Sequence, residues 1–180
     1  MIEYFKNKYR INLLRLRNWD YSWSGLYFVT ICTKDKICFM SEIKNDKIYL
    51  TEIGKIVFEE WLNNSELRKN VFLDDFIIMP NHIHGIIGIE DNDFDKRRDT
   101  PRHVSTNREF GYLPAKSLSS IINHFTGAVK RKCIKRNLDF YWQSNYYEHI
   151  IRDQDDLSRI KEYISNNPIN WENDRNNPNN

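Results

Sequence analysis

The chain has 180 residues, of which 40% are hydrophobic and 29% charged, a composition that favours one folded domain and excludes both a disordered tail and a membrane protein. No apolar stretch approaches the roughly 20 residues that span a bilayer, and the first residues lack the apolar region of a signal peptide. Three cysteines without a CxxC pair fit neither a disulfide scaffold nor a thiolate zinc site, so we expect a cytoplasmic protein.

Hydrophobic periodicity then gives a set of predicted elements. Runs rich in aromatic and β-branched residues predict strands, and apolar residues that recur every three or four positions predict helices. Thr51, Ser117 and the carboxylates from Asp153 onward are typical helix N-termini. In chain order, the predicted elements are a buried strand at 26–33, an edge strand at 47–50, a helix at 51–64, a hairpin of strands at 72–79 and 82–89, a helix from 117, a strand at 146–151 and a last helix from about 153 that Pro168 ends.

This order of elements predicts an α+β fold. Strand, helix, strand, strand, helix, strand is the split βαβ, ferredoxin-like arrangement, an antiparallel sheet with helices on one face, here with an extra C-terminal helix. We expect a single domain over 1–172, with a basic N-terminal arm at 1–20 and a mobile loop at 90–114, because that loop has no usable periodicity. Residues 173–180 are mostly Asn and Pro and are predicted to be disordered.

His82 and His84 are the first candidates for chemistry. Two positions apart in a strand, they lie on one face and form a two-point metal platform, although an isolated HxH pair also arises by chance. Tyr163 and Asn167 are four apart in the last helix and share a face at the edge of its apolar stripe. The alternative for this second pair is ordinary packing and a helix end before Pro168.

Several motifs in a fixed order resemble the single-tyrosine HUH transposases, and specifically their REP-associated branch. These motifs are Asp20-Tyr21-Ser22, Tyr27-Phe28-Val29-Thr30, Pro80-Asn81-His82-Ile83-His84-Gly85, Trp142-Gln143, Tyr146 to Arg152, and Tyr163-Ile164-Ser165-Asn166-Asn167-Pro168. The resemblance covers roughly residues 10–172, and the linked motifs are far more specific together than any one of them.

The resemblance implies a metal-dependent endonuclease and strand transferase that acts on single-stranded DNA with hairpin structure. His82 and His84 would bind a divalent ion, Mg²⁺ or Mn²⁺, and Tyr163 on the extra helix would attack the scissile phosphate. Asn167 matches the third metal ligand, where insertion-sequence relatives have the longer Gln. A 5′-phosphotyrosine intermediate would conserve the phosphodiester energy, so rejoining needs no ATP.

Two basic clusters and three aromatic residues are the candidates for DNA contact. The basic clusters are equally explained as solvated helix faces, and cations at the C-terminal end of a helix also interact favourably with the helix dipole. The alternative for the aromatic residues is packing in the hydrophobic core. Cations contact phosphates and aromatic rings stack on unpaired bases. The candidates are Arg10, Arg15, Arg17, Lys130, Arg131, Lys132, Lys135 and Arg136 for the backbone, and Trp19, Tyr21 and Trp23 for stacking.

Three other functions compete with this one. A domesticated protein would bind DNA hairpins without turnover, a replication-type HUH nickase would need further domains, and a hydrolytic HxH enzyme would have no use for Tyr163. Tyr146 and Tyr147 are rival nucleophiles by residue type, but they lie in a predicted strand and lack an amide at helical spacing. The sequence leaves open whether the protein acts as a monomer or as a homodimer with the tyrosine in trans.

Overall fold

A four-stranded antiparallel sheet organises the fold, with helices on both of its faces. The computed structural model describes residues 4–5, 9–10, 24–90 and 117–180. Its elements are β1 (Tyr4–Phe5), β2 (Tyr9–Arg10), β3 (Gly25–Cys32), η1 (Lys34–Lys36), β4 (Ser41–Lys44), β5 (Lys47–Leu50), α1 (Glu52–Leu67), β6 (Val71–Ile78), β7 (His82–Ile89), α2 (Leu118–Lys135), β8 (Tyr147–Ile151), α3 (Gln154–Asn166) and η3 (Trp171–Asn173).

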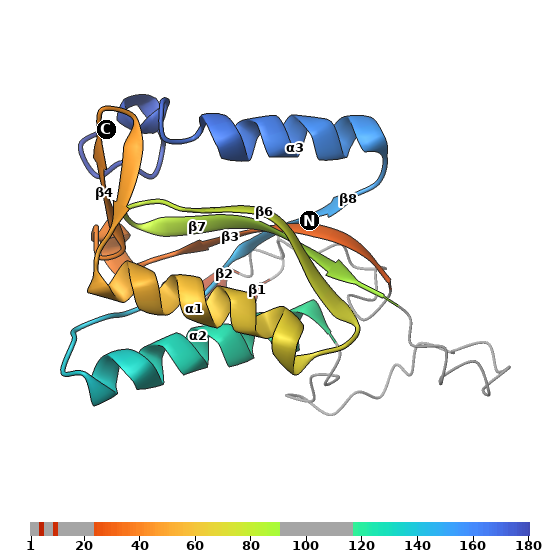
Figure 1. Cartoon of the computed structure of the whole chain (residues 1–180), viewed down its shortest axis with the longest axis horizontal. Coiled ribbons are helices and arrows are strands. Elements are labelled where there is room, and N and C mark those ends of the chain that lie inside the picture. Colours follow the sequence, from red (N-terminus) through yellow and green to blue (C-terminus); the bar gives the residue numbers. More distant parts are fainter. Residues whose placement is uncertain (1–3, 6–8, 11–23, 91–116) are drawn as a thin grey trace, which may run out of the picture.

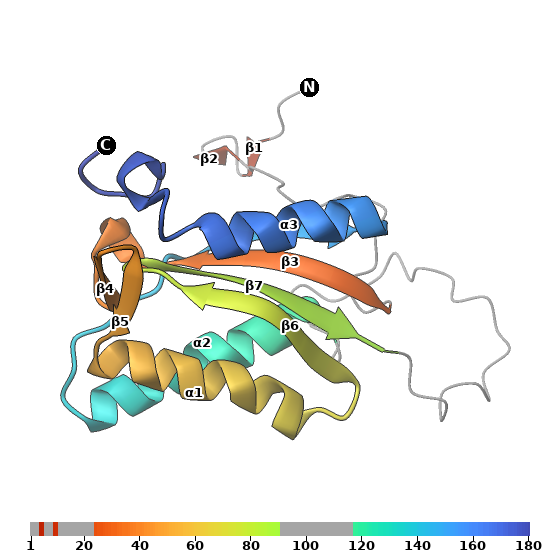
Figure 2. The ribbon, with the colours of Figure 1, turned by 45° about the horizontal axis from the view of Figure 1, so that its top comes forward.

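The strand order β6-β7-β3-β8 confirms the predicted α+β class and the antiparallel sheet. Helices α1 and α2 cover one face, and α3 lies alone across the other (Figure 1). The view in Figure 2 separates the same three layers and shows the C-terminal turn at the end of the sheet where β4 and β5 stand. No helix in the described ranges is both long and apolar enough to cross a bilayer.

Alternation along the central strands builds two cores of unequal size. Tyr27, Val29 and Ile31 of β3 join the large cluster beneath α1 and α2, whereas Phe28 joins a small cluster with Ile164 of α3. This is the period-2 pattern of a strand buried on both faces. The large cluster therefore stabilises the sheet and its two helices, and the small one holds α3 on the opposite face.

Close contact between α1 and β7 requires a glycine at position 85. A Cβ atom built on Gly85 would lie only 2.3 Å from the indole of Trp61, which is fully buried. The motif Pro80 to Gly85 therefore ends on a packing position directly after the histidines. Trp61 presses on one face of β7 while the imidazoles occupy the other.

The helix starts agree with the predicted caps. The side chains of Thr51, Ser117 and Asp153 accept hydrogen bonds from the backbone N–H groups of Gly54, Ser120 and Asp156 respectively. Helix α1 runs to Leu67, one turn beyond the prediction. The rest of the helical pattern is as predicted because the apolar stripes face the sheet.

The predicted edge strand at 47–50 is present as β5, and it pairs with β4 in a separate two-stranded sheet. One prediction about local structure is wrong. The tail 173–180 was predicted to be disordered, but it folds into turns whose polar groups find fixed partners. The carbonyl of Asn176 accepts a hydrogen bond from Asn81 (2.7 Å), and that of Arg175 accepts one from Lys36 (2.7 Å). The predicted loop 90–114 lies outside the described residues apart from Glu90.

Candidate active site

The site begins at the first residues of β7. In the register between β3 and β7, His82 pairs with Cys32 and His84 with Thr30. Both histidines are buried and lie on the face that α3 covers, with their ring centroids 4.4 Å apart. The strand thus places two imidazoles side by side, as their spacing predicts.

Asn81 fixes how His82 presents its ring. The Asn81 amide nitrogen donates to the carbonyl of Lys36 (2.9 Å) and to that of Asn176 (2.7 Å), so its amide oxygen must be the atom facing His82 Nδ1 at 2.9 Å. An amide oxygen only accepts, so Nδ1 of His82 carries the proton and Nε2 keeps its lone pair. Among the described residues, nothing hydrogen-bonds this buried Nε2. It is the atom through which a neutral histidine binds a metal.

His84 is held on both of its ring nitrogens. Its Nδ1 shares a hydrogen bond with the Thr30 hydroxyl (2.8 Å), and its Nε2 lies 3.2 Å from the Tyr163 hydroxyl. The Phe28 ring stacks on the imidazole at 5.4 Å. Each ring nitrogen of His84 therefore shares a hydrogen bond with a hydroxyl group, and Nε2 is the one that faces the tyrosine.

Burial keeps both imidazoles neutral. It lowers the pKa of His82 to about 4, partly offset by the Asp174 carboxylate. It lowers the pKa of His84 well below its usual range, helped by the repulsion that a second proton on the neighbouring His82 would bring and by the charge of Arg175. Neutral imidazoles are the form that ligates a cation. The site therefore holds two competent nitrogen ligands at neutral pH.

Helix α3 carries Tyr163 to the histidines. Its Lys161 forms an ion pair with Asp74 of β6 (2.6 Å), which ties the helix to the far strand of the sheet. The Tyr163 ring meets His84 at 5.0 Å between centroids, yet the residue is 45% exposed. Burial raises the pKa of the phenol, and the nearby Asp174 charge raises it further. The side chain is therefore partly accessible from solvent, and its raised pKa keeps the hydroxyl protonated at neutral pH.

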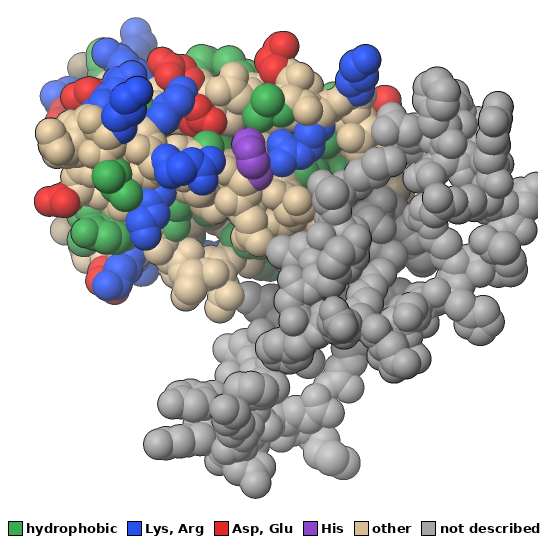
Figure 3. All heavy atoms as spheres, turned by 90° about the horizontal axis from the view of Figure 1, so that it is seen from below, with side chains coloured by type: hydrophobic (Ala, Val, Ile, Leu, Met, Phe, Trp, Pro, Cys, Tyr) green, Lys and Arg blue, Asp and Glu red, His purple; other side chains and the backbone are tan. Residues whose placement is uncertain are grey.

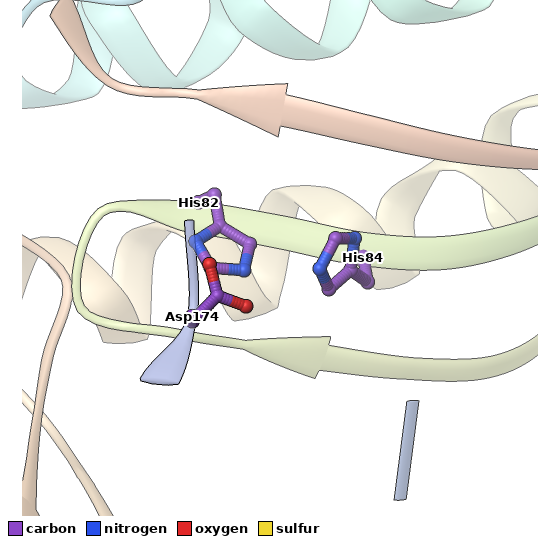
Figure 4. A group of neighbouring side chains, drawn as sticks. All are labelled: His82, His84 and Asp174. Atoms are coloured by element: carbon purple, nitrogen blue, oxygen red, sulfur yellow. The ribbon is translucent and has the colours of Figure 1, made fainter. Parts of the chain in front are cut away.

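The remaining side chains offer oxygen atoms. Asn167 lines one hollow together with Tyr163 and Asp174, and its buried Oδ1 has no hydrogen-bond partner among the described residues. Asp174 follows η3 and, with His82 and His84, forms a group whose ligand atoms lie within 4.8 Å of one another (Figure 4). Two unpaired buried polar atoms and a carboxylate beside two imidazoles fit a divalent cation.

The structure therefore brings together all four residues that the sequence singled out, His82, His84, Tyr163 and Asn167. It adds Asp174, which sequence reasoning missed because the surrounding tail has no periodicity and was expected to be disordered. The rival Tyr146 lies on the opposite face of the sheet, where its hydroxyl is 3.5 Å from Ser119 of α2.

Tyr147 and the other histidines lie apart from this centre. The ring of Tyr147 is near Phe28 on the α3 side, at 6.4 Å, but no hydrogen bond joins Tyr147 to His84 in the described part of the chain. His149 pairs with Asp156 at the start of α3 (2.7 Å), and His124 is exposed on α2. These positions keep Tyr163 as the tyrosine at the histidine pair.

The predicted DNA-contact cations of α2 divide into two groups. Lys132 forms ion pairs with Glu60 (2.5 Å) and Glu59 (3.3 Å) of α1, and Arg136 pairs with Glu52 (3.4 Å). These two cations hold α2 to α1, which the sequence pattern could not distinguish from a solvated face. The other three, Lys130, Arg131 and Lys135, are exposed. Figure 3 shows Lys and Arg side chains spread among acidic ones on the face that carries α1 and α2.

The remaining predicted contacts fall outside what the structure describes. The predicted backbone contacts Arg15 and Arg17 and the stacking candidates Trp19, Tyr21 and Trp23 lie in segment 11–23, and Arg10 belongs to β2, where only the backbone is described. His103 lies in the undescribed segment 91–116. Their assignments stay predictions.

Comparison with known proteins points in one direction. An uncharacterized protein of Haemophilus influenzae is 38% identical over 163 residues, 90% of each chain. A second protein of that organism, described as a "putative REP-associated tyrosine transposase", is 25% identical over 157 residues, 83% of this chain and 73% of its own. A solved structure of a REP-associated tyrosine transposase bound to a REP hairpin matches in fold, with a TM-score of 0.59 at 17% identity over 87% of this chain and 74% of its own. No family model matches the chain.

Proposed function

Because the chain belongs to the REP-associated tyrosine transposases, a branch of the single-tyrosine HUH transposases, we propose that it cleaves and rejoins single-stranded DNA that carries a hairpin. The observation that carries the proposal is the Tyr163 hydroxyl 3.2 Å from Nε2 of His84, beside the unpaired Nε2 of His82. This arrangement unites a nucleophile with two metal ligands on one sheet face.

We propose His82 and His84 as the nitrogen ligands of a divalent cation, with oxygen atoms from Asn167 and Asp174 beside them. Oxygen donors favour Mg²⁺ or Mn²⁺ over softer ions. When bound, such a cation draws charge from a non-bridging phosphate oxygen and makes the neighbouring phenol easier to ionise. Because burial raises the pKa of Tyr163, that help matters here.

The proposed reaction is a balanced exchange of one phosphodiester for another. The Tyr163 oxygen bonds to phosphorus while the bond from phosphorus to the 3′-oxygen breaks. The phenol gives up its proton, and the departing 3′-oxygen takes one. The downstream fragment is then held through its 5′-phosphate, and a new 3′-hydroxyl reverses the step on another strand, so strand transfer needs no ATP.

The geometry supports cleavage within one protomer. The Tyr163 hydroxyl lies 3.2 Å from Nε2 of His84 of its own chain, so the tyrosine and the histidines meet within one copy. We propose that the tyrosine acts in cis, and that a homodimer is not needed for the first cleavage. The three cysteines are free thiols, which suits the reducing cytoplasm where we propose that the protein works.

The test is a covalent adduct. Purified protein is mixed with hairpin-bearing single-stranded DNA from beside its gene, labelled at the 3′ end, with Mn²⁺ or Mg²⁺, and is run on a denaturing gel. A 5′-phosphotyrosine keeps the 3′-labelled fragment on the protein, whereas DNA labelled at its 5′ end leaves no labelled adduct. Tyr163→Phe should lose the adduct but still bind the DNA.

Tyr147→Phe is the matched control, since it removes a second phenol from the same side of the sheet. It should keep the adduct, and His82→Ala should lose it. If wild type binds the hairpin tightly but forms no adduct with either metal, the alternative of a domesticated hairpin-binding protein replaces the proposal. An adduct that persists in Tyr163→Phe would reassign the nucleophile.

A further inference from the structure

A second hollow lies on the other side of β3 from the histidines. Its cavity of about 430 Å³ is bounded by α2 and the segment 141–146, and Ile31 of β3 also lines it. The next residue, Cys32, pairs with His82. The hollow, which we call the α2 groove, thus lies at the end of the sheet that holds the site, facing the opposite way.

The walls of the α2 groove combine an aromatic ring with polar and cationic side chains. Trp142 is fixed there, because its indole N–H donates to the carbonyl of Thr126 (3.2 Å) and its ring packs against Phe140 at 4.7 Å. Lys34 and Lys130 are exposed at the rim of the groove, and neither forms an ion pair with a described residue. Lys132, which lies in α2 together with Lys130, does form one. The amides of Asn123 and Gln143 complete the lining.

A glycine in the middle of α2 also lines the groove. Gly127 weakens the helix relative to alanine, so a packing reason is expected. None is found within the described chain, because a Cβ atom there would meet only the flexible end of Arg131, at 3.1 Å. The bare backbone instead widens the groove wall. This is the room a flat ligand needs to approach the helix.

A neighbouring hollow continues the groove toward the active site. It measures about 500 Å³, shares Lys34, Trp142 and Gln143 with the α2 groove and extends to Lys36. The Lys36 ammonium donates to the carbonyl of Arg175 (2.7 Å), the residue after Asp174. The two hollows therefore follow a path around the end of the sheet, from α2 to the rim of the site, on which Lys130, Lys34 and Lys36 outnumber the one carboxylate, Asp35.

We propose that the α2 groove binds the unpaired strand that adjoins the hairpin, with a nucleobase between Trp142 and Gly127 and phosphates at Lys34 and Lys130. The inference rests on the proposed function and adds the path of the substrate to it. An aromatic ring with lysines and amides is the chemistry that binds single strands, because the bases of a duplex are already stacked and cannot reach such a ring. The strand leaves the groove past Lys36 and enters the site on the α3 face.

The test compares two DNA probes by fluorescence anisotropy, a hairpin oligonucleotide with an unpaired flank and the same hairpin without it. Gly127→Leu fills the groove at a half-buried position of the helix and should weaken binding of the flanked hairpin about tenfold, the value of one stacked base. Binding of the bare hairpin should not change. The thermal midpoint should not fall, since leucine favours a helix more than glycine does.

His124→Leu is the matched control, because it adds the same side chain at an exposed position of α2 outside the groove. Lys34→Ala with Lys130→Ala should lower the slope of log affinity against log salt by roughly 0.7 per lysine for the flanked probe only. The control pair Lys47→Ala with Lys69→Ala, exposed lysines outside both hollows, should leave this slope unchanged.

The outcomes separate the two proposals. A folded Gly127→Leu variant that binds the flanked hairpin as wild type does would overturn the groove assignment. Equal affinity of wild type for flanked and bare hairpins would also overturn it, while the proposed function would stand. Wild type that binds neither probe would overturn the proposed function, and the groove assignment with it.

Discussion

Replacing Asn81 by alanine should weaken Mn²⁺ binding to the folded protein by about 10- to 100-fold, although Asn81 itself offers no ligand to the ion. The amide oxygen of Asn81 holds the Nδ1 proton of His82 at 2.9 Å and so keeps Nε2 unprotonated and aimed into the site. Without this oxygen, the ring is free to turn and to take the other tautomer. Part of the free energy of metal binding is then spent on fixing the orientation and tautomer of the His82 ring, so the measured affinity falls.

The same substitution should also destabilise the fold by about 2–3 kcal/mol, since Asn81 is buried and makes three hydrogen bonds worth about 1 kcal/mol each. Ser41→Ala separates the two effects. Ser41 is equally buried and donates to the carbonyl of Ile78 (3.1 Å) but does not touch His82. It should cost about 1 kcal/mol and leave Mn²⁺ affinity unchanged.

The assay is a titration of Mn²⁺ followed by electron paramagnetic resonance of the free ion, far below the thermal midpoint of each variant, so that only folded protein is compared. Asn81→Asp keeps an oxygen toward His82 and should retain most of the affinity even though it loses both donated hydrogen bonds. If Asn81→Ala is destabilised but binds Mn²⁺ as tightly as wild type, the positioning role of the amide is refuted.

Three further predictions use other assays. Mixing His82→Ala with Tyr163→Phe should not restore cleavage, because the histidines and the tyrosine meet within one chain; recovered adduct in the mixture would reveal a shared site. Burial lowers the pKa of His82 from 6.5 to about 4, so the metal-free protein should lose stability as the pH falls across that range, where only the unfolded chain takes up the proton. Thermal unfolding at stepped pH checks this, and a smaller slope is expected for His82→Ala. Lys130→Ala with Arg131→Ala should flatten the salt dependence of DNA binding, whereas Lys132→Ala should mainly lower the thermal midpoint; the reverse result would contradict the ion-pair assignment.

Local spacing was sufficient to place four of the five residues at this site. Alternation in a strand puts His82 and His84 on one face whatever else the chain does, and helical spacing does the same for Tyr163 and Asn167. What spacing does not give is the pairing of these two faces. That pairing arises because α3 crosses the sheet on the side opposite α1 and α2, where the packing of Phe28 against Ile164 in the small cluster holds it.

Asp174 and the paired cations show where sequence patterns stop. Asp174 lies between Asn173 and Arg175 in a segment with neither helical nor strand periodicity. Its position depends on hydrogen bonds from Lys36 and Asn81 to the backbone carbonyls of the next two residues. Lys132 and Arg136 belong to a run of cations that looks uniform in the sequence. Only the carboxylates of α1 beneath α2 distinguish these two from their neighbours.

The contacts that hold the C-terminal turn against the site span much of the chain. Asn81 and Asn176 are 95 positions apart, and Lys36 and Arg175 are 139 apart. Closing such long loops costs chain entropy, and this cost is offset only when both distant parts of the chain are folded. A fragment that lacks either part therefore does not present the same ligand set. A divalent ion that binds only the finished site would add RT ln(1 + [ion]/Kd) to the stability of the whole fold. Loss of the ion would then lower the thermal midpoint of the entire domain and not only that of the C-terminal turn, because the contacts that complete the centre join distant parts of the chain.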